Sequence, residues 1–432
     1  MKQRILFIAL VSFIIVNLNY GSGFQINESG AKAMAMAGAF AGVANDASAI
    51  HFNPAGITQL QGTNISAGVS LIIPSFKYTS PDGNEYEIEK KVFTPFNVYI
   101  THQFSEKFSA GFGVNTPYGL GTFWEDEEWP GRYLALDTEI RTFVFTPVIA
   151  YKVSDAFSIS AGLRYGYGDV LISRKTAIVN PSPPAYLTDG LVELEGDGTA
   201  LGFVAGILVK PSEMIQLGLS YRSEMNYTFE GDAVNTIPAP YNAAIPSTAL
   251  PYGPISADLT TPQNITFGVG IMPNEAVTIS ADFQYVGWSS YDKLEIDFDD
   301  WANPLTGEQR LSSERNFENS FIARLGAEYK ASEQFALRGG LLYDNNPVTD
   351  EMLEPTLPDA DRIGLNIGLG YQFTENLSMD LAYFLLIFNE RQIEDSEVDQ
   401  NPSPLAPGIQ PFNGTYNSTA HLFGINLNYA IN

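Results

Sequence analysis

The chain has 432 residues, of which 23 are Lys or Arg and 49 are Asp or Glu, and its formal net charge is −26. Such an acidic chain lacks the basic face that phosphate binding needs, which excludes nucleic acid as a partner. It contains no cysteine, so disulfides cannot stabilise it, whereas 22 Tyr and 28 Phe make it rich in aromatic rings. This composition fits either an outer-membrane β-barrel or a soluble secreted β-protein, and periodicity has to decide between them.

The first 23 residues have the pattern of a secretory signal peptide. Two basic residues come first, an apolar run follows over 5–16, and small residues occupy 21–23. The apolar run is too short to cross a bilayer as a helix, and the alternative interpretation is a buried strand. We therefore predict export, with residues 1–23 removed and a mature chain that begins near Phe24.

Residues 24–60 differ in composition from the rest of the chain. From Gly30 onward about half of their positions are Ala or Gly. Alanine favours helix, yet no broad apolar face of large side chains is present to bury one. The segment ends at Asn53, Pro54 and Gly56, a strong helix breaker that we interpret as a structural junction with the first strand.

The region 61–432 alternates between short turns and long polar insertions. Six turns share a pattern in which Ser, Thr or Asn stands beside an acid between alternating residues, as in "YKVSDAFSISAGLRYGYG" from Tyr151. Six short turns and seven long loops require fourteen strands with both ends on the short-turn side, as in outer-membrane barrels. The predicted loops lie near 80–92, 117–137, 175–196, 231–261, 299–316, 345–361 and 394–418.

The strands have one apolar face and one small or polar face. Ile363, Leu365 and Ile367 alternate with Arg362, Gly364 and Asn366, for example. In lipid every backbone group must be paired, so such strands must close into a barrel. An arginine facing lipid would cost about 2–4 kcal/mol. Inward positions are therefore predicted, near Asp282, Glu328 or Asp380, for Arg164, Arg324 and Arg338.

A fourteen-stranded barrel encloses more room than its own side chains fill. The small residues of 24–60 precede the first strand and would let short helical turns lie against a glycine-rich wall. We predict that this segment is a plug inside the barrel. The alternative is a flexible periplasmic tail, although tails are usually more charged.

Several stretches, in order along nearly the whole mature chain, resemble the FadL family of outer-membrane transporters of long-chain fatty acids and other hydrophobic compounds. They include "GFQINESGAKAMAMAGAFAGVANDASAIHFNPAG", "NTPYGL", "WPGRYLALDTEIRTFVFTPVIAYKVSD", "QYVGWSSYDKLEI" and "LPDADRIGLNIGLGYQFTENLSMDLAYF". The resemblance implies a fourteen-stranded barrel closed by an N-terminal hatch. It also implies a loop groove that captures ligand, an inner pocket that holds it, and an inward kink in the third strand that releases it sideways into lipid. The chain departs from the family by ending in Asn432 rather than an aromatic residue.

The resemblance places the capture groove in the second long loop, at residues that we predict to form an exposed aromatic patch: Tyr118, Leu120, Phe123, Trp124 and Trp129. The alternative is a loop core that buries its own rings. Phe24 matches the mature N-terminus that reaches the inner pocket, where the three inward arginines could meet a carboxylate. Gly111 and Gly113 match the third strand, where glycine permits a kink or instead makes room for the hatch.

Other functions have weaker support. Only three histidines exist, and no nucleophile elbow or paired-histidine metal motif is present, so we predict no enzyme, no cofactor and no metal site. Acidic loops at 125–128 and 297–300 could bind Ca²⁺ and bridge it to lipopolysaccharide, but solvated loops are the simpler interpretation. We predict a monomer that transports a hydrophobic small molecule across outer-membrane lipid. A porin for polar solutes is the alternative.

Overall fold

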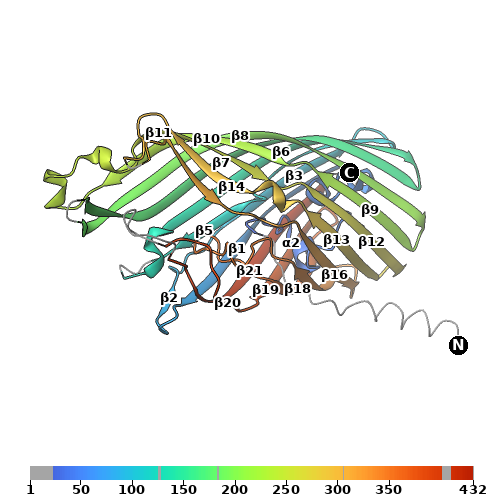
Figure 1. Cartoon of the computed structure of the whole chain (residues 1–432). Helices are drawn as coiled ribbons and strands as arrows, with labels where there is room; N and C mark the ends of the chain where they lie inside the picture. Colours follow the sequence, from blue (N-terminus) through green and yellow to red (C-terminus); the bar gives the residue numbers. More distant parts are fainter. Residues whose placement is uncertain (1–22, 125–127, 182–183, 305, 401–409, 432) are drawn as a thin grey trace.

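The computed structural model describes residues 23–124, 128–181, 184–304, 306–400 and 410–431. The predicted signal peptide, apart from Gly23, lies outside these residues. The described chain is a barrel of fourteen antiparallel strands, several of them interrupted, with a few short helices at its N-terminal end (Figure 1). None of the helices in the described part has the length and apolar composition needed to cross a membrane.

The barrel closes because its first and last strands pair along their whole length, from Thr63 opposite Ile431 to Thr79 opposite Thr415. In order around the barrel the strands are β1 (Thr63–Thr79), β3 (Phe96–Gln103), β4 with β5 (Phe108–Asn115, Gly119–Phe123), β6 (Asp137–Ser154), β7 (Phe157–Pro181), β8 (Pro184–Ser212), β9 with β10 (Ile215–Arg222, Met225–Thr236), β11 with β12 (Gly253–Thr261, Asn264–Asn274), β13 with β14 (Val277–Val286, Lys293–Phe298), β15 with β16 (Arg310–Glu314, Ser320–Lys330), β17 (Phe335–Asp344), β18 (Arg362–Gln372), β19 with β20 (Leu377–Phe388, Arg391–Ile393) and β21 (Gly414–Ile431). The prediction of fourteen strands from turn spacing is confirmed.

The two faces of the wall follow the alternation of the sequence. Leu163, Leu201 and Ile367 point outward and are 66%, 75% and 62% exposed, whereas Ser66 and Ser280 point inward and are buried. An apolar outer surface with a polar lining is what a closed barrel in lipid requires. The short turns gather at one end of the barrel, and the long connections gather at the other (Figure 1).

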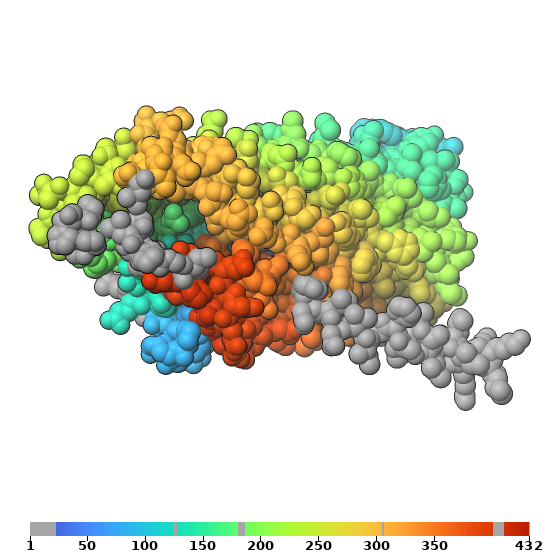
Figure 2. Space-filling model, viewed as in Figure 1, coloured from blue at the N-terminus to red at the C-terminus, as the bar shows by residue number. Residues whose placement is uncertain are grey.

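One predicted loop is largely strand, and a second is about half strand. β7 and β8 remain paired through 175–196, as far as Pro181 opposite Pro184, and β10 and β11 pair within 231–261 but leave 237–252 outside the strands. The polar sequences predict loops because strands that extend beyond the lipid need no apolar face. The wall therefore extends at one side into a long sheet, seen at the left of Figure 1. Figure 2 shows a hollow at this end of the molecule.

The hatch, residues 24–60, lies inside the barrel. It contains α2 (Ala31–Ala35), α3 (Ala49–Phe52) and the 3₁₀ helix η1 (Pro54–Gln59). Glycines of the wall make room for it. A Cβ on Gly218 would lie 1.9 Å from the Ala41 carbonyl oxygen, and one on Gly268 would lie 2.3 Å from the Gly42 nitrogen. The small residues of hatch and wall thus let the two backbones meet in van der Waals contact.

The junction after the hatch is capped by Asn53, the residue that precedes Pro54 in the sequence. Asn53 precedes Pro54 at the start of η1, and its side chain accepts a hydrogen bond from the Ala55 N–H at 3.2 Å. The same side chain donates to the carbonyls of Ala41 and Ile207, both at 3.0 Å. A Cβ on Gly56 would lie 2.2 Å from the Ala44 carbonyl oxygen, so only glycine fits there.

Candidate functional site

The third strand of the barrel wall is broken. β4 ends at Asn115, β5 begins at Gly119, and the intervening residues make only an isolated bridge, between Tyr118 and Gln25 of the hatch. The Gly119 N–H donates to the Phe24 carbonyl at 3.0 Å, and the Ile26 N–H donates to the Pro117 carbonyl at 2.8 Å. The first residues of the hatch therefore pair with the broken strand from inside the barrel.

Gly111 and Gly113 were predicted either to permit a kink or to make room for the hatch, and their positions favour the second role. Both glycines stay in continuous register with β3 and β6. A Cβ on either would lie within about 3 Å of Ile50, so these glycines make room for the hatch. The signal that could have located the break is Pro117, because a proline has no N–H to donate within a central strand.

A cavity of about 470 Å³ lies against the break, within the size range of small-molecule sites. Its inner wall combines the hatch with strands from the far side of the barrel, and its main apolar residues are Phe24, Ile26, Met34, Ile72, Phe76, Tyr118, Leu120, Ile140, Leu342, Leu357, Phe384, Leu386, Phe388 and Leu422. Such a lining repels water and favours an apolar ligand.

The cavity also has lining residues from the outer face of the wall. Phe96 shares its face with the exposed Val98 and Ile100 of β3, and Phe143 shares its face with the exposed Ile149 of β6. Both phenylalanines line the cavity, and their ring centroids are 5.9 Å apart. Residues of both faces therefore border one space at the break.

One end of the cavity is charged. Arg362 Nε is 2.9 Å from Asp344 Oδ2, and both residues line the cavity. Asp359, in the loop before β18, accepts a hydrogen bond from the Gly23 N–H at 2.7 Å. Burial raises the pKa of Asp359 to about 6, and the nearby Arg362 guanidinium opposes this rise. This loop carboxyl therefore titrates close to neutral pH.

Arg324 is a cavity arginine without an ion pair in the described residues, although the carboxyls of Asp344, Asp282 and Glu28 lie near enough to interact with it electrostatically. It lies opposite Asp282 in register, but Asp282 Oδ2 accepts N–H bonds from Phe40 at 2.9 Å and Ala41 at 2.8 Å of the hatch. Arg324 is only 7% exposed, and no ion pair joins it to a carboxylate in the described part of the chain. Gly38, at a φ of 75°, lets the guanidinium pass, because a Cβ there would lie 3.1 Å from Nε.

The other two predicted arginines lie outside the cavity. Arg338 forms ion pairs of 2.6 Å with both Glu328 and Asp380, as predicted for a wall arginine. Its guanidinium is therefore already paired and is not available to a ligand. Arg164 donates to the Ser223 carbonyl at 3.2 Å. The predicted role of these two in an inner pocket is not supported by their positions.

The predicted capture residues divide into two groups. Tyr118 and Leu120 line the cavity, whereas Phe123, Trp124 and Trp129 are at most 8% exposed and do not border it. The indoles of Trp124 and Trp129 stack at 4.1 Å, and their N–H groups donate to the carbonyls of Pro355 and Ala135. The prediction of an exposed patch was wrong for these three, because the loops bury their own rings.

A fourteen-stranded, plugged barrel with an apolar cavity that both faces of its wall border belongs to the class of outer-membrane transport barrels. The chain belongs to the family described as "Outer membrane protein transport protein (OMPP1/FadL/TodX)", whose model matches residues 13–431. The predicted family and outer-membrane location are thus confirmed, and the family is one of transporters rather than enzymes.

Relatives match the chain over its full length. It is 26% identical to the "Long-chain fatty acid transport protein" of Escherichia coli O6:H1, with all of both chains covered. It is 27% identical to the "47 kDa outer membrane protein" of Pasteurella multocida, with 94% of each covered.

Solved structures share the fold. A Pseudomonas aeruginosa FadL homologue superposes with a TM-score of 0.82 at 22% identity, covering 95% of this chain and all of that one. The Ralstonia pickettii toluene transporter TbuX gives 0.68 at 16% identity, covering 93% of this chain and 98% of that one.

Proposed function

We propose that this protein carries hydrophobic small molecules inward across the outer membrane by passive diffusion, with the cavity as the holding site and the wall break as a lateral exit. The observation that supports the proposal is that residues of both faces of the wall border one largely apolar cavity, among them Phe24 and Met34 inside the barrel and Phe96 and Phe143 on the outer face. A ligand leaving there would enter lipid without crossing the polar interior.

The ligand classes are fatty acids and aromatic or aliphatic hydrocarbons, in line with relatives named for fatty acids and toluene. Burying each methylene contributes about 0.8 kcal/mol, so the apolar lining suffices to hold a long chain. The buried Arg324, which has no ion pair among the described residues, supports a carboxylate head group at the charged end, since a guanidinium suits bidentate pairing.

Release requires the hatch to yield at the break. Two backbone hydrogen bonds tie Phe24 and Ile26 to the broken strand, at Gly119 and Pro117. If contacts with the ligand replaced these two hydrogen bonds, the inner side of the exit would open. Transport then follows the concentration gradient, and no ATP or redox cofactor is needed.

Ligand binding by purified protein tests the proposal. A fluorescent fatty acid should bind with saturation and be displaced both by an unlabelled fatty acid and by an alkane. The matched pair Phe96→Ala and Phe104→Ala removes one outward ring at the exit and one at a periplasmic turn. Slower uptake by cells carrying Phe96→Ala alone would support the lateral exit, whereas equal uptake by both variants would refute it.

Conductance separates this proposal from the porin alternative. Because wall glycines contact the hatch backbone, the wild type should be nearly silent in planar bilayers, and deletion of residues 27–50 should give large steps. A bulky polar antibiotic should enter cells that carry the deletion. Large stable steps from the wild type would favour a porin, and a silent but assembled deletion variant would refute the plug.

A further inference from the structure

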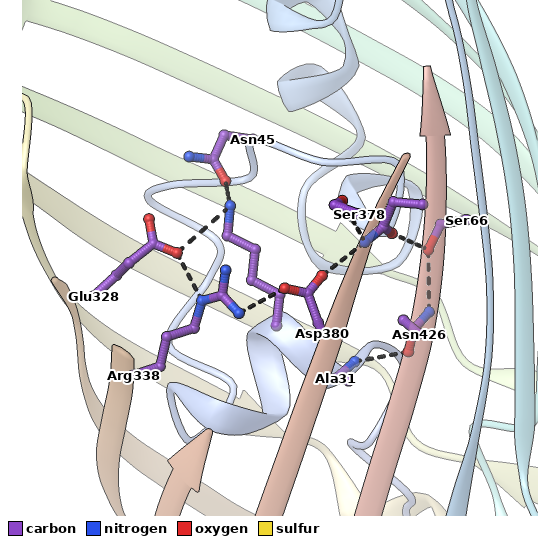
Figure 3. Close-up of polar contacts among 10 residues, drawn as sticks. Ala31, Asn45, Ser66, Glu328, Arg338, Ser378, Asp380 and Asn426 are labelled. Carbon is purple, nitrogen blue, oxygen red and sulfur yellow. Dashed lines mark hydrogen bonds and ion pairs between the residues drawn. The ribbon is translucent and has the colours of Figure 1, made fainter. Parts of the chain in front are cut away.

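The barrel accommodates an inward arginine by pairing it with acids, as Arg338 shows. It lies between Glu328 and Asp380, with both ion pairs at 2.6 Å (Figure 3). Such pairing is needed because a buried guanidinium gives up its water and costs free energy unless an anion replaces that water. Two other inward arginines, Arg164 and Arg222, have no such partners in the described residues.

Both of these side chains are closed off from solvent. Arg164, on β7, is 4% exposed, and Arg222, the last residue of β9, is 8% exposed. Arg164 Nη1 donates to the Ser223 carbonyl at 3.2 Å, and Arg222 Nη1 donates to His51 Nε2 at 2.8 Å. A guanidinium carries five N–H donors and no acceptor. Most N–H groups of the two arginines therefore have no acceptor in the part of the chain that the structure describes.

The two guanidiniums are neighbours with the same charge. Ser223, which accepts the hydrogen bond from Arg164, directly follows Arg222 in the chain. Arg164 and Arg324 are the charged side chains that act most strongly on Arg222, and both repel it. His51 contributes no charge, because a nitrogen that accepts a hydrogen bond from a guanidinium belongs to a neutral imidazole. An anion between Arg164 and Arg222 would offset this repulsion.

A tyrosine hydroxyl beside Arg164 also lacks a partner. Tyr227, on β10, has no exposed surface, and its hydroxyl forms no hydrogen bond within the described residues. A Cβ on Gly166 would lie 2.1 Å from this hydroxyl oxygen, and Gly166 is the inward position next to Arg164 on β7. Successive inward positions are about 7 Å apart, a distance that an arginine side chain spans. Since a buried hydroxyl is normally hydrogen-bonded, Tyr227 is a second, independent sign of a missing acceptor.

We propose that Arg164, Arg222 and Tyr227 bind a small inorganic anion of about the size of chloride. The three side chains supply hydrogen-bond donors and no negative charge, and hydrogen bonds from charged donors are roughly twice as strong as those between neutral groups. Through Arg222 and its bond to His51, the ion would connect β7, β9 and β10 of the wall to the hatch. None of the three residues lines the cavity, so the inference goes beyond the proposed transport function and does not depend on it.

Thermal unfolding tests the site without any transported ligand. An ion that binds only the folded barrel raises the unfolding temperature by mass action. When chloride replaces gluconate at constant ionic strength, the unfolding temperature of the wild type should rise by several degrees. Gluconate is too large for an enclosed site between two guanidiniums, and the constant ionic strength keeps electrostatic screening equal. An unfolding temperature that does not respond to chloride would overturn the proposal.

A matched pair of tyrosines tests the hydroxyl. Tyr416 also has a buried hydroxyl with no partner in the described residues, but its ring packs on that of Tyr78, with the centroids 5.1 Å apart. Removing a buried hydroxyl that has no partner relieves a desolvation penalty, so Tyr416→Phe should fold and keep the wild-type response to chloride. Tyr227→Phe should instead raise several-fold the chloride concentration that gives half of the stabilisation. The same response to chloride from both variants would overturn the proposed site.

A second pair of variants tests the charge. Arg164→Gln removes a guanidinium of the site and should abolish the response to chloride. Arg310→Gln removes a half-exposed guanidinium that is paired with Asp297, and it should leave the response unchanged. If Arg164→Gln fails to fold, Arg164→Lys keeps the charge with fewer donors and should shift the response to several-fold higher chloride. A wild-type response from a folded variant at Arg164 would overturn the proposal.

Bromide locates the ion, because it is similar to chloride in size and scatters X-rays anomalously. A crystal of the wild type soaked in bromide should show an anomalous peak within hydrogen-bond distance of Arg164, Arg222 and the Tyr227 hydroxyl. Peaks confined to the surface of the protein would overturn the proposal.

A fatty acid separates this site from the cavity. Saturating fatty acid should leave the response to chloride unchanged, because the three residues do not line the cavity. Competition between the fatty acid and chloride would assign the two arginines to the carboxylate of the ligand and overturn the inorganic anion site. If the wild type bound no fatty acid at all, the proposed transport function would fail, and the chloride and bromide results would still decide whether the anion site exists.

Discussion

The loop cluster and the cavity are both rich in aromatic residues, but the rings pack together in the first and border an open space in the second. In the loop cluster Trp129 stacks on Trp124 and meets Tyr78 and Phe412 edge-on, so the rings cover one another's surface. In the cavity the rings border an open space of about 470 Å³. The cavity rings also contact one another, as Phe76 and Phe388 do at 5.8 Å, but they leave a shared space open. Aromatic content therefore indicates a binding site only where the rings do not fill the space between them.

The largest effect is expected in the loop cluster. Trp129→Ala removes a fully buried indole and should cost about 3–5 kcal/mol of loop stability, with ligand affinity of the cavity nearly unchanged. Limited proteolysis and thermal unfolding measure the loop stability, and fluorescent ligand binding measures the affinity of the cavity. Tyr186→Ala, at an exposed ring, is the control. A large loss of affinity with stable loops would restore Trp129 as a ligand contact.

The charged end of the cavity should show the next largest effect. Arg324→Gln should weaken fatty-acid binding about 10–100-fold, because a hydrogen bond to a charged group contributes about 1.5–3 kcal/mol, and should leave alkane binding unchanged. Arg338→Gln should instead destabilise the barrel without this selectivity, since it leaves Glu328 and Asp380 without their cation. If Arg324→Gln lost affinity equally for the fatty acid and the alkane, the role of Arg324 would be structural only.

A larger side chain in the cavity tests the same comparison by removing the open space that the loop cluster lacks. Leu342→Trp adds a ring where space exists, so the barrel should fold normally while a long-chain ligand loses contact for two or three methylenes, or about 10–50-fold in affinity. The heat-modifiable shift of the folded barrel and ligand titration check both parts. A destabilised barrel with unchanged affinity would mean that the cavity is not the holding site.

The remaining effect concerns pH, at the point where the 345–361 loop meets the cavity. Burial raises the pKa of Asp359 to about 6 and that of Asp361 to about 7, whereas the ordinary value is 3.8. The folded loop therefore binds protons more tightly than the unfolded chain, and its stability falls as pH rises from about 4 to about 7. Proteolysis of this loop should be slower at pH 5 than at pH 8. Asp359→Asn with Asp361→Asn should abolish that difference.

The strand count could be predicted because backbone pairing in lipid forces a period of two and a regular turn spacing, which "YKVSDAFSIS" and its relatives display. Side-chain partners could not. Alternation places Arg164, Arg324 and Arg338 on the inner face but does not give their depth. Only the folded register shows that Arg338 lies between two acids while Arg324 borders the cavity.

The loop cluster escaped prediction for a related reason. Trp129 is buried by Tyr78 near the end of β1 and by Phe412 in the last loop, and no local sequence pattern indicates these contacts. Glycine is similarly ambiguous, since the residue that permits a bend also permits close approach. Gly111 and Gly113 serve the second purpose, and the proline at 117 marks the break.

The long β7–β8 hairpin determines how far the barrel wall extends beyond the lipid. β8 has 29 residues, and at about 3.3 Å per residue it is about 95 Å long, whereas a tilted strand needs only about 9–11 residues to cross the hydrocarbon. Even at a tilt of about 45° it stands some 40 Å above the lipid. The β7–β8 hairpin thereby carries one side of the barrel wall well beyond the lipid.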